Sequence, residues 1–191
     1  MFSIPNCLTF FRILVIPIIV AIHLSDVAYA NWYNVILFTL AGISDALDGY
    51  LARLWGQESK LGAFLDPVAD KLLVATMLIL IATDPVVRAN LLASWFFTLI
   101  VVVIIGRELM VSALREWMAE LGKRANVAVS QVGKYKTGIQ MTAIGMLLFK
   151  QSLFGIPILR LGELMLYGAG ILTIWSMFIY LSAAYTAVRS D

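Results

Sequence analysis

Long runs of apolar residues, separated by short polar stretches, dominate the pattern along this chain of 191 residues. A helix needs about 20 mostly apolar residues to cross a bilayer core. The pattern predicts six membrane-spanning helices at residues 8–24, 32–54, 61–82, 91–105, 133–149 and 159–187. The fourth is expected to continue as an amphipathic helix to about residue 121, with Gly122 as its C-cap.

The first residues mix large apolar side chains with polar ones, and Pro5 with Asn6 indicates a turn or helix start. This mixture favours a short interfacial helix before the first span. The first long apolar run lacks a basic region before it and a small-residue cleavage site after it. We therefore expect a retained span, kinked at Pro17, and not a removed signal peptide.

The composition agrees with a polytopic membrane protein. Hydrophobic residues make up 61% of the chain and charged residues 14%, whereas soluble domains average about 45–50% and about 25%. The length suits one compact all-α bundle, so a single domain over residues 1–191 is expected. The net charge of +2 gives no electrostatic reason to expect nucleic-acid binding, and the lone Cys7 excludes an intramolecular disulfide.

Basic residues in the connections predict the orientation. The connections after the first, third and fifth spans contain few of them: Arg88, Lys150 and Arg160. The opposite side contains Arg53, Lys60, Arg107, Arg115, Lys123, Arg124, Lys134 and Lys136. The positive-inside rule then places both termini, and the connection between the second and third spans, in the cytoplasm.

Four aspartates interrupt the apolar pattern. Asp45 and Asp48 are three residues apart on the second span, and Asp66 and Asp70 are four apart on the third, so each pair shares one helix face. A short connection makes these spans antiparallel neighbours, and the two pairs are expected to face each other near the cytoplasmic rim. Charges in apolar segments are costly, so these acids require compensation.

Hard divalent cations are the favoured compensation, because Mg²⁺ binds a few carboxylates together with substrate phosphate oxygens. Two such ions can hold a diphosphate. Gly49 and Gly62 leave room for a ligand near the backbone, and Arg53 is placed to reach a phosphate. The alternative is a set of ion pairs with Arg53, Lys60 and Lys71, which leaves the two glycines unexplained.

The acids belong to the longer pattern D-x2-D-G-x2-A-R-x8-G-x3-D-x3-D. Its fixed positions are Asp45, Asp48, Gly49, Ala52, Arg53, Gly62, Asp66 and Asp70. On this motif the chain resembles the CDP-alcohol phosphotransferase family. The resemblance implies six transmembrane helices preceded by an interfacial helix, a homodimer, and a site for divalent metal, Mg²⁺ or Mn²⁺, with two ions expected.

The resemblance also implies roles for single residues. Asp45, Asp48 and Asp66 would ligate metal, and Asp70 would do so too or act as the general base. The CDP moiety of the donor would be contacted by Asn6, Thr9, Gly49, Ala52, Arg53, Ser59 and Gly62.

Outside the motif the chain resembles family members that use sn-glycerol 3-phosphate as acceptor. The matching stretches are IPNCLTFFRILVIP, GAFLDPVADK and GRELMVSALREWMAELGKRANVAVSQVGKYKT. This implies transfer of the phosphatidyl group of CDP-diacylglycerol to sn-glycerol 3-phosphate, with CMP released, in a bacterial cytoplasmic (inner) membrane. The acceptor phosphate needs a basic pocket, and the candidates are Arg107, Arg115, Lys134 and Lys136. These residues also fit ordinary positive-inside residues or contacts to anionic lipid.

Three alternatives stay open. One is a family enzyme with another acceptor, such as serine, inositol phosphate or a second phosphatidylglycerol. Another is a cation transporter, which is disfavoured because the acids lie near one rim and no inverted repeat is visible. The third is a structural membrane protein, which leaves the motif unexplained. The single histidine, His23, is expected to be structural.

Overall fold

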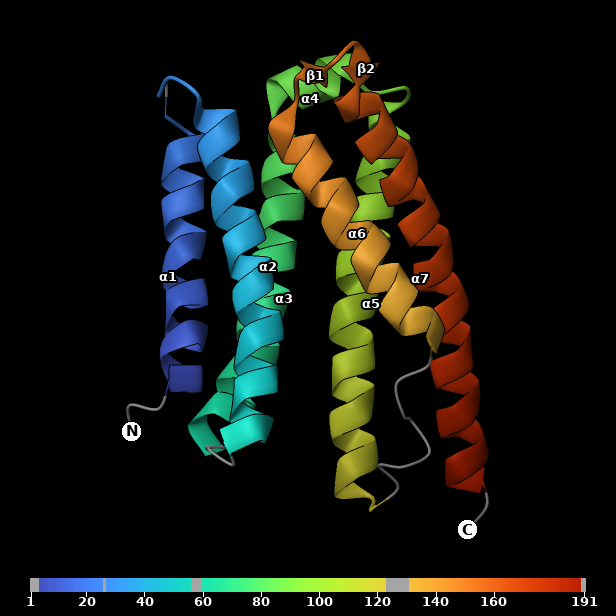
Figure 1. Cartoon of the computed structure of the whole chain (residues 1–191). Coiled ribbons are helices and arrows are strands. Elements are labelled where there is room, and N and C mark those ends of the chain that lie inside the picture. Colours follow the sequence, from blue (N-terminus) through green and yellow to red (C-terminus); the bar gives the residue numbers. More distant parts are fainter. Residues whose placement is uncertain (1–3, 26, 56–59, 123–130, 190–191) are drawn as a thin grey trace.

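The structure, a computed structural model, describes residues 4–25, 27–55, 60–122 and 131–189, some of them (such as 49–53 and 131–134) by their backbone only. It is a bundle of long helices with a short helix and a hairpin at one end (Figure 1). The elements are α1 (Ile4–His23), α2 (Ala30–Trp55), α3 (Lys60–Thr83), α4 (Pro85–Asn90), α5 (Ser94–Glu120), α6 (Gln131–Phe149), β1 (Ser152–Leu153), β2 (Ile156–Pro157) and α7 (Ile158–Arg189).

The first helix corrects one expectation. Residues 4–23 form one continuous helix, with Pro17 inside it, and no separate interfacial helix precedes the span over these residues. Pro5 lies in the first turn, where the N–H that proline lacks would have no intrahelical partner. Pro5 is therefore compatible with the first turn of this helix and does not divide it.

As helices, the other five predicted segments agree with α2, α3, α5, α6 and α7 to within about three residues at each end, when the extension of the fourth to residue 121 is counted. This agreement follows from long apolar runs bounded by polar residues. Gly122 has the positive φ of +72° that favours glycine just after a helix, although the C-cap itself is Leu121.

Two connections contain structure that the apolar pattern did not predict. The stretch after α3 forms α4, because the Asp84 side chain accepts hydrogen bonds from the N–H groups of Val86 (2.8 Å) and Val87 (3.0 Å). The connection between α6 and α7 contains an antiparallel hairpin that pairs Ser152 with Pro157. Gly155 has a φ of +79° in the turn of this hairpin.

The helices are arranged so that α1 packs against both α2 and α3, α6 packs against α2 and α7, and α5 packs against α3 and α7. The start of α1, the end of α2, the start of α3 and the end of α7 lie at the end opposite the hairpin (Figure 1). Fully buried apolar side chains fill the interior: Ile19, Met77, Leu78, Phe97, Ile104, Ile144, Leu147 and Leu166.

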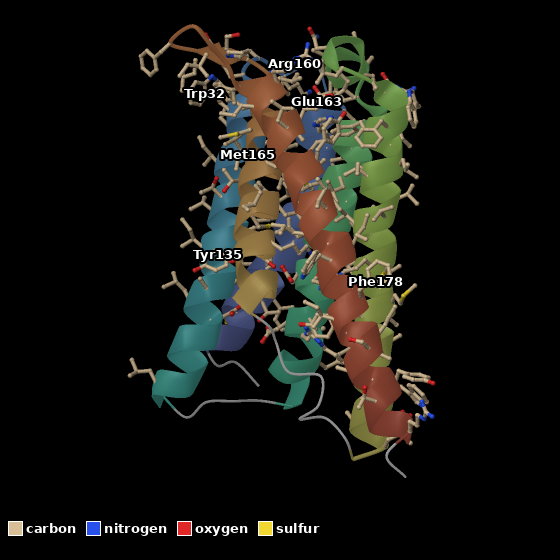
Figure 2. The ribbon with its side chains drawn as sticks, turned by 90° about the vertical axis from the view of Figure 1, so that its right-hand side faces the viewer. Trp32, Tyr135, Arg160, Glu163, Met165 and Phe178 are labelled. Carbon is tan, nitrogen blue, oxygen red and sulfur yellow. The ribbon has the colours of Figure 1, made fainter. Side chains whose placement is uncertain are left out.

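The hairpin end is held by two buried acids. Asp84 accepts a hydrogen bond from Lys150 and lies 3.0 Å from Nε2 of His23, so it joins the end of α1 to the end of α6. Glu163 accepts hydrogen bonds from the N–H of Leu92 (2.8 Å) and the hydroxyl of Tyr167 (2.6 Å). Figure 2 shows Glu163 at this end of α7. His23 thus has the structural role expected of it.

The outer surface is apolar. In the described part of the chain, Ser94–Glu120 and Ile158–Thr186 are long and apolar enough to cross a membrane, and Cys7–His23 is a shorter apolar segment. Large side chains are exposed along several helices, such as Leu14, Ile36, Leu99 and Trp175. Water would not favour so much contiguous apolar surface, so the bundle is suited to lipid.

Candidate active site

The four aspartates lie in the half of the bundle away from the hairpin. Asp45 and Asp48 lie in the second half of α2, and Asp66 and Asp70 lie in the first half of α3. The first helix, α1, packs against both α2 and α3, and its side chains contact acids of both pairs. The two acid pairs are therefore connected through α1 side chains.

Arg12 of α1 lies between the two aspartates of α2. Its Nη1 is 2.7 Å from Oδ1 of Asp45, and its Nη2 donates to Oδ2 of Asp48. The Arg12 side chain is fully buried, that of Asp48 is 4% exposed, and that of Asp45 is 48% exposed. The pair thus has one buried partner cation and one carboxylate open to the surface.

Thr9 lies one turn before Arg12 on the same face of α1. Its hydroxyl donates a 2.6 Å hydrogen bond to Oδ1 of Asp66. Thr9 was expected near the nucleotide, and the structure places it on an acid of the motif. One short segment of α1 therefore contacts both acid pairs.

Asp70 lies between the acids and a second set of charges. It is half-buried on α3. The charged groups close enough to act on its carboxylate are Asp45, Arg12, Glu108 and Lys136. Asp70 therefore links the motif to the basic residues of α5 and α6.

Those basic residues share one carboxylate. Lys136 and Nη1 of Arg107 both contact Oε1 of Glu108, the latter at 3.3 Å. Arg107 also donates a 2.9 Å hydrogen bond to the hydroxyl of Ser176 on α7. Arg107 and Lys136 are both buried, so this is an internal cluster and not a solvated face.

Arg115 extends the cluster along α5. It donates a 2.9 Å hydrogen bond to the hydroxyl of Tyr180. The guanidinium groups of Arg107 and Arg115 lie 5.5 and 5.1 Å from the centre of the Tyr180 ring, within the range of cation–π contacts. Arg107 and Arg115 therefore lie on the same face of α5.

The carboxylate oxygens of the four aspartates are the kind of ligand that a hard divalent cation prefers. In the conformation described, no three acidic, histidine or cysteine side chains among the described residues are close enough to hold one metal ion. The guanidinium of Arg12 occupies the position of a cation between Asp45 and Asp48. Two of the four carboxylates thus already bind positive charge.

Of the three cations considered for ion pairs in the alternative interpretation, only the side chain of Lys71 is described. Lys71 donates to the hydroxyl of Ser112 on α5. Among the described side chains, Arg12 pairs with the motif, and the sequence interpretation did not assign it to the site. The side chains of Arg53 and Lys60 lie outside the described residues.

Comparison with known proteins decides the family. The family profile described as CDP-alcohol phosphatidyltransferase matches residues 2–175. The chain belongs to this family. A relative from Salmonella choleraesuis (strain SC-B67) is 45% identical over 96% of this chain and 95% of its own length. One from Escherichia coli (strain K12) is 44% identical over the same shares. Both are named CDP-diacylglycerol--glycerol-3-phosphate 3-phosphatidyltransferase.

The structure describes only some residues of the family motif together with their surroundings. Gly62 is buried near the start of α3. Several residues expected to bind substrate lie on described helices, but their side chains are outside the description: Asn6, Gly49, Ala52, Arg53 and Lys134. Ser59 lies outside the described residues altogether.

Three residues of the site were missed because they lie outside the motif: Arg12, Ser176 and Tyr180. A signal for Arg12 was present, since an arginine next to a long apolar run needs a partner in the bundle. Ser176 and Tyr180 lie in the apolar α7, where a hydroxyl group by itself does not indicate a site. Only the packing of α7 against α5 identifies them.

Proposed function

We propose that this protein transfers the phosphatidyl group of CDP-diacylglycerol to sn-glycerol 3-phosphate and releases CMP. The relatives named for that reaction match nearly the whole chain. The observation that carries the proposal is that Asp70 lies within electrostatic reach of both the acidic motif and the Glu108–Lys136 pair. One substrate needs the acids and the other needs the cations, so the reaction requires both in one place.

Asp45, Asp48 and Asp66 would hold Mg²⁺ or Mn²⁺, with two ions expected, and Asp70 would join them or act as the general base. A bound divalent cation would stabilise the negative charge that develops on the diphosphate. The support is the donor chemistry of the four carboxylates and the cation already present between Asp45 and Asp48.

Asp70 would take the proton from the primary hydroxyl of the acceptor. The hydroxyl oxygen then forms a bond to the β-phosphorus of the donor, while the bond from that phosphorus to the oxygen of CMP breaks. Arg53 would balance the charge on the departing CMP. No covalent intermediate with the protein is needed.

The acceptor phosphate would bind the basic residues of α5 and α6. Arg107 and Lys136 both contact the single carboxylate of Glu108, and Arg115 adds a third positive charge beside the Tyr180 ring that Arg107 also contacts. Such a cluster has an excess of donors, and a phosphate dianion satisfies them. Lys134, two residues before Lys136, would join them.

The lipid part of the donor would lie between helices. A groove of about 670 Å³ runs between α2 and α6, and its lining is mostly apolar: Trp32, Phe38, Gly42, Ala46, Met141 and Phe149. Ala46 is next to Asp45 in the chain, so an acyl chain in this groove would start beside the acids.

We propose six spans in a bacterial inner membrane, with both termini and the active site in the cytoplasm, and a homodimer.

The test is an acceptor panel with labelled CDP-diacylglycerol, scoring CMP release and lipid product with and without a chelator. Among the acceptors of the panel, we expect only sn-glycerol 3-phosphate to give lipid product and CMP. The chelator should abolish both. Product with serine or inositol phosphate instead would assign a different acceptor. Metal uptake into vesicles without CMP release would favour the transporter.

A further inference from the structure

Arg12 binds one oxygen of each of the two aspartates that α2 contributes to the proposed metal site. It contacts Oδ1 of Asp45 and Oδ2 of Asp48 and is fully buried. An arginine keeps its charge in a protein, so this positive charge is permanent. A divalent ion held by the same two carboxylates would lie close to this charge, and the two cations would repel each other.

The guanidinium is incompletely satisfied where it lies. Among the described residues, its buried Nε has no hydrogen-bond partner. The contact of Nη1 with Asp45 is an ion pair of 2.7 Å whose geometry does not make it a hydrogen bond. Buried donors without acceptors are costly. Arg12 would therefore gain from a different anion, such as a phosphate that binds it bidentately.

We propose that Arg12 is a resident cation: it neutralises Asp45 and Asp48 in the metal-free protein and leaves them when a divalent ion binds. This inference rests on the metal site of the proposed function. Arg12 keeps two acids together in an apolar bundle where they would otherwise repel each other. In return it lowers the affinity for metal, because every binding event must displace it.

The experiment measures Mn²⁺ binding to the purified full chain in detergent, by the electron paramagnetic resonance signal of free Mn²⁺. The variants are Arg12→Met, which removes the charge, and Arg12→Lys, which keeps the charge but cannot bind two carboxylates side by side. We expect Arg12→Met to bind Mn²⁺ about tenfold more tightly than wild type, equivalent to ~1.4 kcal/mol. Arg12→Lys should lie between them. Arg160→Met, which loses an ion pair at the hairpin end, is the control and should match wild type.

Thermal unfolding of the same proteins gives a second measure. In chelator, Arg12→Met should unfold at a lower temperature than wild type, because its acids lack a counter-charge, and Mn²⁺ should raise its midpoint more than that of wild type. Equal or weaker Mn²⁺ affinity in both Arg12 variants would overturn the role of Arg12 while leaving the metal site intact. Failure of the wild type to bind Mn²⁺ at all, even with CDP added, would overturn the metal site itself.

Discussion

At the scale of single residues, the acids and the cations of the site depend on each other. Glu108 contacts Arg107 and Lys136 through one oxygen, and Arg12 contacts two aspartates. Each set has an excess of one charge: negative on α2 and α3, positive on α5 and α6. The proposed ligands would supply the missing charge. A metal ion would neutralise the acids of α2 and α3, and a phosphate would neutralise the cations of α5 and α6.

Substitution of Asp70 tests the proposed base. Asp70→Asn preserves the shape of the side chain and removes its ability to take a proton. We expect CMP release to fall by a factor of about 10²–10⁴, with CDP binding largely kept. Rates of CMP release and calorimetric binding of CDP measure the two effects. Glu116→Gln, on the exposed face of α5, should not change the rate. Turnover like that of wild type in Asp70→Asn would rule out Asp70 as the base.

Removal of Arg107 tests the acceptor site. Arg107→Ala deletes a charged donor, and one such hydrogen bond is worth about 1.5–3 kcal/mol. The KM for sn-glycerol 3-phosphate should therefore rise by roughly ten- to a hundredfold, and the KM for CDP-diacylglycerol should change much less. Arg88→Ala, at the exposed end of α4, serves as the control. Equal effects on the two KM values would indicate that Arg107 only holds α5 to α7.

At the scale of helices, the approach of α6 to α7 is set by a small residue. A Cβ added at Gly162 would lie 2.8 Å from Cβ of Met146 and 3.2 Å from the carbonyl oxygen of Ala143. The second of these atoms belongs to the backbone, so the helices themselves would have to move apart. Because α6 carries Lys136 and borders the groove with α2, this contact also positions the site.

Gly162→Ala should accordingly destabilise the protein. Overpacking costs about 1–3 kcal/mol, which exceeds the gain of up to about 1 kcal/mol from the higher helix propensity of alanine. Gly168→Ala is the matched control on the same helix, because an added Cβ there meets nothing within 4 Å. Thermal unfolding in detergent should show a lower midpoint for the first variant and an equal or higher one for the second. The opposite order would contradict the close contact.

At the scale of the whole molecule, one end of the bundle has a structural role and the other end contains the candidate active site. The hairpin end contains a closed structural cluster around Asp84, and the other end contains the incompletely satisfied site. Burial alone would raise the pKa of Asp84. Hydrogen bonds from Lys150 and the N–H of Val87, with the positive charges of Lys150 and His23, outweigh burial and hold the pKa below its usual 3.8.

This direction fixes the sign of a pH dependence. A carboxylate with a lowered pKa stabilises the fold above its unfolded pKa, near 4, and that contribution is lost as pH falls through the folded value. Asp84→Asn keeps the cap of α4 but leaves Lys150 unpaired, at a cost of roughly 3 kcal/mol. We expect the difference in unfolding midpoint between wild type and Asp84→Asn to shrink below about pH 4. A difference independent of pH would contradict the ionised Asp84.

The sequence by itself determined the helices and the chemistry of the motif, because apolar runs and helical spacings are local properties. Long runs predicted α2, α3, α5, α6 and α7 closely, and the eight-position motif around the four aspartates carried the resemblance to the family that the comparisons show. It did not predict α4, which depends on the cap supplied by Asp84.

The tertiary structure decided the partners of the charged residues. Arg12 and Asp48 are 36 positions apart, Thr9 and Asp66 are 57 apart, and Arg107 and Ser176 are 69 apart. Contacts over such distances depend on which helices become neighbours. The packing of α1 onto both α2 and α3, and of α7 onto α5, follows from the fit of many side chains at once, and no spacing along the chain encodes it.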